Sequence, residues 1–341
     1  MLKIAMLGLQ HYHANFWTRA IQQSPDAEVA GVWDPDAGRA SAFAAEYGIA
    51  AETDLDNLVE RADAVAICSA TADHKALIAV AVRHAKPVLC EKPLGRDLAD
   101  AREIRSMVET AGIAFMQSFP KRFDPVNHEI RDLLRAEAIG TITMCRVRHG
   151  HSHGLNPRFR DEWFVDPARS GGGTLLDEGV HAADFLRWMF GMPVSVAATI
   201  SGAALGLRVE DAAFASFVFE TGMIAEVATS WTFAAADTSI EIYGTEGTIL
   251  LGGVDIASRP NREDGFLRVF RRDGEGGAWS TSPTVPHFKT GVFHEHVAWA
   301  FVEALRSGAA MPVTLEDGIA AQAMIDAAYA SAASGRRVTL E

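Results

Sequence analysis

The sequence predicts an α/β protein with two domains, a doubly wound parallel sheet first and then an α+β domain with a large, mainly antiparallel open sheet. Two observations lead to this prediction. Up to residue 122, short apolar and β-branched runs alternate with helical stretches, which is typical of βαβ units. After Arg122, strand-like runs follow one another with turn residues between them, which favours antiparallel pairing. We therefore expect domains at 1–122 and 123–341.

The elements of the first domain follow from apolar periodicity and from breaker residues. Strands are expected at Lys3–Leu7, Glu28–Trp33, Ala64–Cys68, Pro87–Cys90 and Ile113–Gln117. Helices are expected at His13–Gln23, Ala37–Tyr47, His74–Ala85 and Asp97–Ala111. Ser24-Pro25 and Gly48 end two of these helices, and Asp97 is placed to cap another. Parallel sheets of this kind bind ligands at the carboxyl ends of their strands.

The second domain is expected to be a sheet with flanking helices. Its strands are predicted at Thr141–Arg148, Val194–Ser201, Ala212–Glu220, Met223–Trp231, Ser239–Tyr243 and Thr248–Leu251. Its helices are predicted at Thr174–Phe190, Phe293–Arg306 and Leu315–Ser334. Residues 258–290 are rich in Gly, Pro, Arg and Asp and indicate long loops or a weak hairpin.

Bulk properties exclude several classes of partner. The chain has 341 residues, of which 48% are hydrophobic and 22% charged, and its formal net charge is −13. It is therefore expected to be globular, and neither nucleic acid nor an anionic membrane surface is an expected partner. Its apolar runs fall short of the roughly 18 residues of a membrane span, and its start lacks a cleavage site. Cys68, Cys90 and Cys145 are too few for a disulfide framework, so a cytoplasmic location is expected.

The first turn predicts a dinucleotide site. Gly8 follows the first strand, and the helix that starts near His13 offers its N-terminal amides to a pyrophosphate. The fingerprint G-x-G-x-x-G is incomplete, because Gln10 and His13 occupy glycine positions. Asp34 ends the second strand where an acid would bind the adenosine ribose hydroxyls. Since neither Pro35 nor Asp36 supplies a cation for a 2′-phosphate, NAD is favoured over NADP. Alternatively, Asp34 only starts a turn.

Two distant segments supply proton-transfer chemistry. Glu91-Lys92-Pro93 follows a predicted strand, and Gly171-Gly172-Gly173 is followed by Asp177-x-x-x-His181. Oxidising an alcohol requires a base near the hydroxyl while the hydride leaves. His181 suits that role, Asp177 at i,i+4 can orient it, and Lys92 can stabilise the developing alkoxide or relay the proton. The sequence does not decide which of Lys92 and His181 accepts the proton.

Structural explanations exist for the same residues. Thr174-Leu175-Leu176-Asp177 is also a capping box, so Asp177 could simply start a helix, and His181 could be a core histidine. Their pairing with the glycine triplet and Lys92 favours the functional interpretation. Glu91 is expected to be structural or to lie near the nicotinamide amide. Pro93 is expected to fix the backbone geometry that orients Lys92. A cis Lys92–Pro93 peptide bond is one way in which it could do so.

These motifs resemble the glucose–fructose oxidoreductase / inositol dehydrogenase / MocA family along nearly the whole chain. The resemblance rests on Gly8, Asp34, Ser69 to His74, Glu91-Lys92-Pro93, Lys121-Arg122, Glu162-Trp163-Phe164, Gly171-Gly172-Gly173, Asp177, His181 and Arg336-Arg337-Val338. It implies a Rossmann domain, a sheet domain that makes homodimers or homotetramers, and NAD(P)-dependent redox chemistry on sugars or polyols. It also implies catalytic roles for Lys92, Asp177 and His181, with Lys92 between nicotinamide and substrate. Ser69-Ala70 departs from the Thr-Pro pair common in the family.

The ligand contacts implied by the motifs are as follows. The cofactor is expected to contact Gly8, Gln10, His13, Asp34, Ser69, His74, Glu91, Lys92 and Pro93. The substrate is expected to contact Arg122, His153, Trp163, Asp177, His181 and Trp231, because indole faces stack on sugars and guanidinium groups bridge hydroxyls.

No metal is expected at the histidines near residue 150. His149, His151 and His153 alternate as on a strand, over about 13 Å, and neither a cysteine nor a carboxylate completes a compact ligand set with them.

Two other functions are possible for this set of residues. One is a glycosidase of the same family that uses NAD transiently, and the other is a non-catalytic dinucleotide sensor. Retention of Lys92, Asp177 and His181 together argues against the sensor.

Overall fold

The computed structural model describes residues 1–257 and 259–340. The chain divides into two compact units, each described here by itself. Unit 1 comprises Met1–Pro120, Ala168–Gly171 and His294–Gln322, and unit 2 comprises Lys121–Pro167, Gly172–Phe293 and Ala323–Glu341. The sequence analysis assigned all residues after 122 to the second domain. In the structure, residues 294–322 belong to unit 1. Residue 341, the end of the expected second domain, lies outside the described residues.

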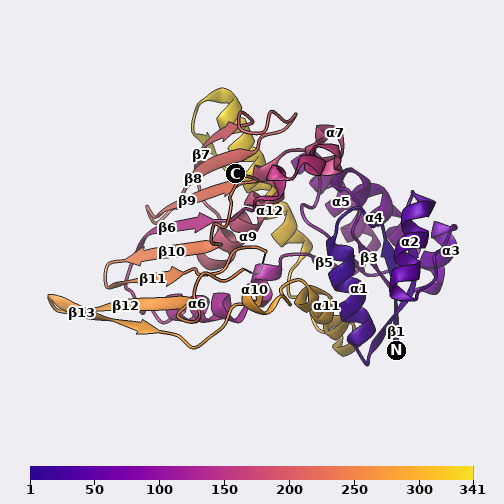
Figure 1. The fold of residues 1–341 in the computed structure, drawn as a ribbon, viewed down its shortest axis with the longest axis horizontal. Coiled ribbons are helices and arrows are strands. Elements are labelled where there is room, and N and C mark those ends of the chain that lie inside the picture. Colours follow the sequence, from indigo (N-terminus) through magenta and orange to yellow (C-terminus); the bar gives the residue numbers. More distant parts are fainter. Residues whose placement is uncertain (258, 341) are drawn as a thin grey trace. The chain divides into compact units, whose positions relative to one another are not determined.

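Unit 1 is built on a parallel sheet of five strands in the order β2-β1-β3-β4-β5 (Figure 1). The strands are β1 (Leu2–Leu7), β2 (Ala27–Trp33), β3 (Ala64–Ile67), β4 (Val88–Cys90) and β5 (Phe115–Gln117). The helices are α1 (His13–Gln23), α2 (Ala37–Tyr47), α3 (Leu55–Arg61), α4 (His74–Arg83), α5 (Leu98–Ala111) and α11 (Glu295–Ser307), with a 3-10 turn η1 (Thr71–Asp73). The predicted doubly wound parallel sheet is thus confirmed.

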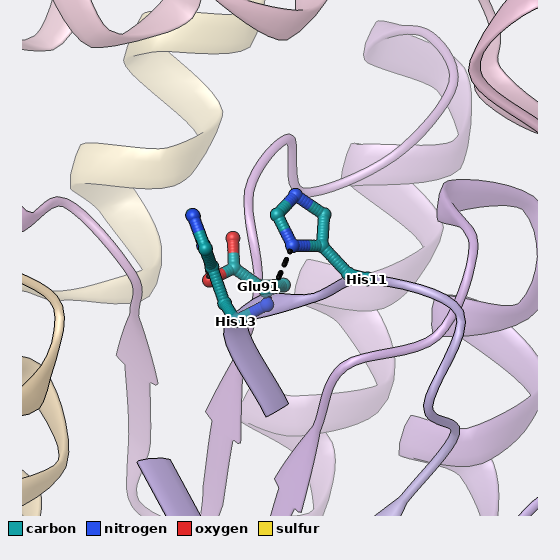
Figure 2. A group of neighbouring side chains, drawn as sticks. All are labelled: His11, His13 and Glu91. Carbon is teal, nitrogen blue, oxygen red and sulfur yellow. Dashed lines mark hydrogen bonds and ion pairs between the residues drawn. The ribbon is translucent and has the colours of Figure 1, made fainter. Parts of the chain in front are cut away.

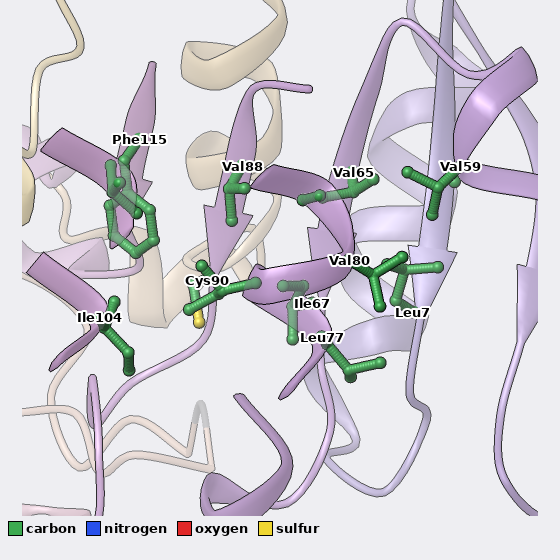
Figure 3. Close-up of a cluster of buried hydrophobic side chains, with 14 of the residues drawn as sticks. Leu7, Val59, Val65, Ile67, Leu77, Val80, Val88, Cys90, Ile104 and Phe115 are labelled. Atoms are coloured by element: carbon green, nitrogen blue, oxygen red, sulfur yellow. The ribbon is translucent and has the colours of Figure 1, made fainter. Parts of the chain in front are cut away.

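The central strand β1 of unit 1 is buried on both of its faces. Ala5 and Leu7 of β1 pack with buried side chains of α3, α4 and α5 in one cluster (Figure 3). Ile4 and Met6 alternate with them along the same strand and are also fully buried. Because successive strand residues point to opposite faces, both faces of β1 must be covered.

Unit 2 is built on a sheet of nine strands in the described part of the chain, in the order β13-β12-β11-β10-β6-β9-β8-β7-β14 (Figure 1). The strands are β6 (Ile142–Arg148), β7 (Ser195–Ser201), β8 (Ala212–Val218), β9 (Ile224–Ser230), β10 (Ser239–Gly244), β11 (Gly247–Leu251), β12 (Leu267–Asp273), β13 (Gly276–Thr281) and β14 (Val338–Thr339). Neighbours pair antiparallel except β6 and β9, which are parallel. The prediction of a large, mainly antiparallel sheet is confirmed.

Apart from α11, the helices that follow residue 120 range from four to twenty residues in length. They are α6 (Pro125–Arg135), α7 (Pro167–Ser170), α8 (Thr174–Asp177), α9 (Gly179–Phe190), α10 (His287–Thr290) and α12 (Leu315–Ser334). Short 3-10 turns are η2 (Pro120–Phe123), η3 (His153–Leu155), η4 (Pro157–Asp161) and η5 (Trp163–Val165). Across residues 1–257 and 259–340, none of the helices has the length and apolar character needed to cross a membrane.

One expected helix differs from the structure. The single helix expected at Thr174–Phe190 is interrupted at Glu178, which separates α8 from α9. The segment expected as long loops or a weak hairpin contains the antiparallel strands β12 and β13, so the hairpin alternative is confirmed. Its first residue, Ser258, lies outside the described residues.

Candidate functional site

The first turn of unit 1 leaves no room for a side chain. Gly8 follows β1 with φ +74, a left-handed conformation that glycine adopts without strain. A Cβ at this position would lie closer than 3.0 Å to the backbone and side chain of Ser69, just beyond β3. Glycine is therefore required for this close packing of the turn against Ser69. The turn lies where β1 has β2 on one side and β3 on the other, the place where sheets of this class bind dinucleotides.

Asp34 lies at the carboxyl end of β2 and is 4% exposed. Its carboxylate accepts hydrogen bonds from the backbone N–H groups of Leu9 (2.7 Å) and Asp36 (2.8 Å). Arg39 Nη1 also lies 2.9 Å from Asp34 Oδ1. The sequence argument considered Pro35 and Asp36 and overlooked this cation, which the first turn of α2 brings back to the end of β2.

Glu91 organises the carboxyl end of β4. It is fully buried, and its carboxylate accepts hydrogen bonds from the Ser118 hydroxyl (3.1 Å) and the Lys92 backbone N–H (2.8 Å), with His13 Nδ1 at 2.7 Å. Lys92 itself is 3% exposed, and the Lys92–Pro93 peptide bond is cis, as one sequence hypothesis expected. The acid next to the lysine thus connects the backbone of β4 to the start of α1.

His13 replaces a fingerprint glycine and is buried at the start of α1 (Figure 2). Its backbone N–H donates to His11 Nδ1 at 3.2 Å, and its ring packs against the ring of His294 with centroids 3.6 Å apart. Burial, and secondarily the charge of Lys92, hold the pKa of His13 well below its ordinary value. The imidazole is therefore neutral near pH 7.

The other expected cofactor residues occupy the same strand edge or the turns after it. Ser69 is buried, and its hydroxyl donates to the carbonyl of Ala70. His74 at the start of α4 is buried, with Nδ1 3.4 Å from the Leu94 carbonyl, and burial lowers its pKa. Gln10 is partly buried. Their roles toward a ligand remain predictions.

In unit 2, Gly173, the last residue of the glycine triplet, lies at the start of α8. A Cβ on Gly173 would lie closer than 3.0 Å to the backbone carbonyl of Glu210. The backbone N–H groups of Gly173 and Leu175 donate to the Glu210 carboxylate at 3.0 and 2.9 Å, and the Tyr329 hydroxyl donates to it at 2.7 Å. The N-cap is Gly173, which has no side chain, and Thr174 follows it as the first residue of the helix. The capping-box explanation for Asp177 is therefore wrong, because Glu210 satisfies the first turn.

Asp177 ends α8 and is 9% exposed. Its Oδ2 accepts a hydrogen bond from Trp231 Nε1 at 3.0 Å. Trp231 is fully buried, and its ring meets the ring of Phe159 edge-on at 4.9 Å. The sequence predicted that Trp231 contacts the substrate, and that contact stays a prediction. The observed hydrogen bond of the indole is to the Asp177 carboxylate.

His181 follows on α9 and is 4% exposed. Its ring lies edge-on to the ring of His149, with centroids 5.0 Å apart. Between Asp177 and His181, the helix break presents Glu178, which is 3.2 Å from His149 Nε2 and 3.3 Å from His151 Nε2. The sequence reasoning missed Glu178. Two features of the sequence could have indicated it: Glu178 is a carboxylate directly after Asp177, and His149 and His151 form a His-x-His pair.

The histidines near residue 150 do not share one strand as expected. β6 ends at Arg148, and His151 continues beside β9 through a hydrogen bond from its N–H to the Ser230 carbonyl. His153 starts η3 and is exposed. The ligand atoms of His149, Glu178 and His181 all lie within 4.8 Å of one another. The argument against a metal therefore did not consider Glu178 as the carboxylate.

Lys121 was also missed as a member of this region. It is 4% exposed, and burial lowers its pKa to about 8, an effect that Asp124, Glu178 and Asp184 partly oppose. Burial likewise raises the pKa of Asp124 to about 6. Two residues with such shifted pKa values in one unit are typical of a functional region.

The buried lysine gives a testable pH dependence. The pKa of Lys121 is about 8 in the folded chain and 10.5 ordinarily. Between these two pH values, the lysine is therefore protonated in the unfolded chain and deprotonated in the folded chain. Lys121 therefore increases the free energy of unfolding as pH rises through this window, by about 3 kcal/mol in total. We expect Lys121→Met to remove this slope in denaturant titrations at pH 7.5–10.5. Equal slopes for wild type and variant would contradict the assignment.

The remaining expected substrate residues have different surroundings. Arg122 is buried and donates from Nη2 (2.6 Å) and Nε (3.0 Å) to the Asp184 carboxylate, with its guanidinium over the ring of Trp188. Trp163 is partly exposed and stacks on Phe164 at 4.0 Å. The guanidinium of Arg122, which was expected to bridge substrate hydroxyls, is thus paired with Asp184. The contact of Trp163 with substrate stays a prediction.

Comparison with known proteins agrees with the fold and the motifs. One family model, an oxidoreductase family with an NAD-binding Rossmann fold, matches residues 2–119, and a second, the GFO/IDH/MocA C-terminal domain, matches residues 127–250. The 1,5-anhydro-D-fructose reductase of Ensifer adhaerens is 30% identical over 333 residues and 96% of both chains. The inositol 2-dehydrogenase of Rhizobium meliloti is 27% identical over 94% of both chains.

A solved structure shows the same fold over the full length. Levoglucosan dehydrogenase, in complex with NADH and L-sorbose, superposes with a TM-score of 0.86 at 19% identity, covering 100% of this chain and 99% of that chain. At this identity the likeness concerns the fold. Taken with the family models and the relatives, the buried Glu91-Lys92-cis-Pro93 segment and the Gly-Gly-Gly…Asp-x-x-x-His segment place this chain in the GFO/IDH/MocA family of NAD-binding oxidoreductases.

Proposed function

We propose that the protein transfers a hydride between the nicotinamide of NAD and a secondary hydroxyl of a sugar, polyol or sugar derivative. The observation that supports this most is the buried Lys92 at the carboxyl end of β4, the sheet edge at which this fold binds dinucleotides. The residues of unit 1 suit such a cofactor. Gly8 lets the turn after β1 pack closely against Ser69, Asp34 is held at the carboxyl end of β2, where an acid would bind ribose hydroxyls, and His13 Nε2 is buried with no hydrogen-bond partner in the described part of the chain.

Each catalytic residue has a proposed role. Bound NAD would supply the hydride acceptor. Lys92 would donate to the substrate oxygen and stabilise its negative charge. His181 would accept the hydroxyl proton, and Asp177, held by Trp231, would bind the substrate hydroxyl or orient the imidazole. Lys92 belongs to unit 1, and Asp177 and His181 belong to unit 2.

The substrate class is proposed from the relatives. Their names, 1,5-anhydro-D-fructose reductase and inositol 2-dehydrogenase, denote enzymes of polyhydroxylated rings. The polar groups of unit 2, namely His149, His151, Glu178 and Lys121, offer both donors and acceptors to several hydroxyls.

A substrate panel tests this function. Monosaccharides, anhydrosugars, inositols and sugar acids would be incubated with NAD or NADP, and absorbance followed at the NADH band. We expect turnover with NAD and at least one polyhydroxylated ring. Glycoside cleavage without net NADH would favour the glycosidase alternative, and nucleotide binding without any turnover would favour the sensor.

The preference for NAD is proposed from Asp34. The carboxylate would repel a 2′-phosphate, while Arg39 beside it could bind that phosphate once the carboxylate is gone. We expect Asp34→Ser to increase the ratio of kcat/KM for NADP to that for NAD by roughly 100-fold, equivalent to about 2.7 kcal/mol. Asp56→Ser, at an exposed position of α3, serves as the matched control. A wild-type protein that already prefers NADP would overturn the assignment.

We also propose a homodimer or homotetramer formed through the sheet of unit 2. Exposed apolar side chains on two neighbouring strands support this, with Phe214 44% and Ile224 39% exposed. A monomer in sedimentation equilibrium at micromolar concentration would contradict it.

A further inference from the structure

The hydrogen bonds of Glu91 define the tautomer of His13. A carboxylate only accepts hydrogen bonds, so the nitrogen of His13 that lies 2.7 Å from Glu91 Oε1 must carry the proton. Ser118 and the backbone of Lys92 donate to the same carboxylate, which keeps it in place. His13 is therefore an Nδ1–H imidazole, and its Nε2 carries a lone pair.

That lone pair is buried and has no hydrogen-bond partner in the described structure. His13 is 2% exposed, and leaving such an acceptor unsatisfied costs free energy. The ring cannot easily turn away, because it packs against the ring of His294 at 3.6 Å. The ring of His11 is a second neighbour and lies 4.1 Å away (Figure 2). The pKa of His13 is lowered by burial, which keeps the ring neutral and the lone pair available.

The position of this acceptor restricts its partner. A pyrophosphate offers acceptors only, and a lone pair would repel it. NAD carries amide-like N–H donors at two places, the adenine amine and the nicotinamide carboxamide. Asp34 marks the adenosine end at β2, whereas His13 contacts Glu91 at the end of β4, next to Lys92, the residue proposed to lie beside the nicotinamide.

We propose that Nε2 of His13 accepts a hydrogen bond from the carboxamide NH₂ of the nicotinamide and so fixes the rotation of that ring before hydride transfer. The inference rests on the proposed use of NAD and assigns His13 as a positioning residue. The loss of a fingerprint glycine at position 13 then has a function, because the histidine supplies a directional contact that glycine lacks.

Cofactor analogues test the contact by binding alone. Dissociation constants would be measured by isothermal titration calorimetry for NAD⁺, its thionicotinamide analogue, which keeps the NH₂, and its 3-acetylpyridine analogue, which has a methyl group instead. We expect the thionicotinamide analogue to bind within about threefold of NAD⁺ and the acetylpyridine analogue about tenfold more weakly, the usual effect of one hydrogen bond. In His13→Phe, which keeps a planar ring, NAD⁺ and the acetylpyridine analogue should bind within about threefold of each other.

The control is His294→Phe, which keeps the stacking and should retain the tenfold discrimination. An unchanged ratio in His13→Phe, or an equal loss for both nucleotides, would overturn the inference in favour of a ribose or purely structural contact. If His13→Phe does not fold, the wild type still decides, because equal affinity for all three nucleotides contradicts the contact. Absence of NAD⁺ binding by the wild type would instead refute the proposed function.

Discussion

Replacing Lys92 by methionine is expected to lower kcat by roughly 10³-fold, the usual effect of removing one preorganised donor or proton-transfer group. Lys92 is 3% exposed and follows Glu91 at the end of β4. Methionine preserves the apolar stem, so the change removes the ammonium with little change of volume. Turnover would be measured at saturating substrate and NAD, and the NAD⁺ dissociation constant by calorimetry.

The binding measurement separates chemistry from folding. The Glu91 carboxylate is contacted by His13, Ser118 and the backbone N–H of Lys92, and methionine leaves these three contacts in place. NAD⁺ affinity should therefore stay within a fewfold of wild type. Lys3→Met, at an exposed strand start, is the matched control and should leave kcat unchanged. A Lys92→Met variant that retains more than about a tenth of wild-type kcat would refute the proposed role.

The second large effect is expected from Gly173→Ala. The added Cβ would lie closer than 3.0 Å to the Glu210 carbonyl oxygen, a backbone atom that cannot rotate away. The start of α8 would have to move off Glu210, which breaks the hydrogen bonds from Gly173 and Leu175. We expect a loss of about 3 kcal/mol in the free energy of unfolding, or roughly 6–12 °C in the unfolding temperature measured by circular dichroism.

Activity gives a second readout for the same variant. Asp177 ends the four-residue helix that Gly173 starts, so displacement of α8 should also reduce turnover at temperatures where the chain stays folded. Gly276→Ala in the exposed β12–β13 hairpin, where a Cβ meets only ordinary contacts, should leave stability within about 0.5 kcal/mol. If Gly173→Ala has the stability and activity of the wild type, the chain can accommodate the added Cβ at little cost in free energy, and the prediction is wrong.

Much of the fold could be predicted because its signals are local. Apolar runs and breakers gave β1, β2 and α2 within one or two residues, since each run forms one element. α3 was missed because it is only seven residues long and depends on Asp54, whose side chain caps it. The break between α8 and α9 was missed because periodicity continues across Glu178, and contacts from residues far along the chain determine that break.

The sequence allowed us to predict which residues belong to the site, but not which other residues contact them. Lys92, Asp177 and His181 come from motifs, whereas the contacts that hold the motifs join residues far apart in sequence. Trp231 reaches Asp177 across 54 positions, and Glu91 reaches His13 across 78. Residue type alone does not reveal such pairs, which explains why Trp231 was expected to face a ligand and why Glu178 and Lys121 were overlooked.

The hydrogen bond between Trp231 and Asp177 also gives unit 2 an intrinsic optical probe. An indole whose N–H points at a carboxylate emits light at a wavelength that depends on the local electric field, and this indole has no contact with water. A ligand that draws negative charge away from Asp177 should therefore shift the fluorescence of Trp231. Occupancy of the carboxylate could then be followed in the unlabelled protein, even with a compound that is bound but never oxidised.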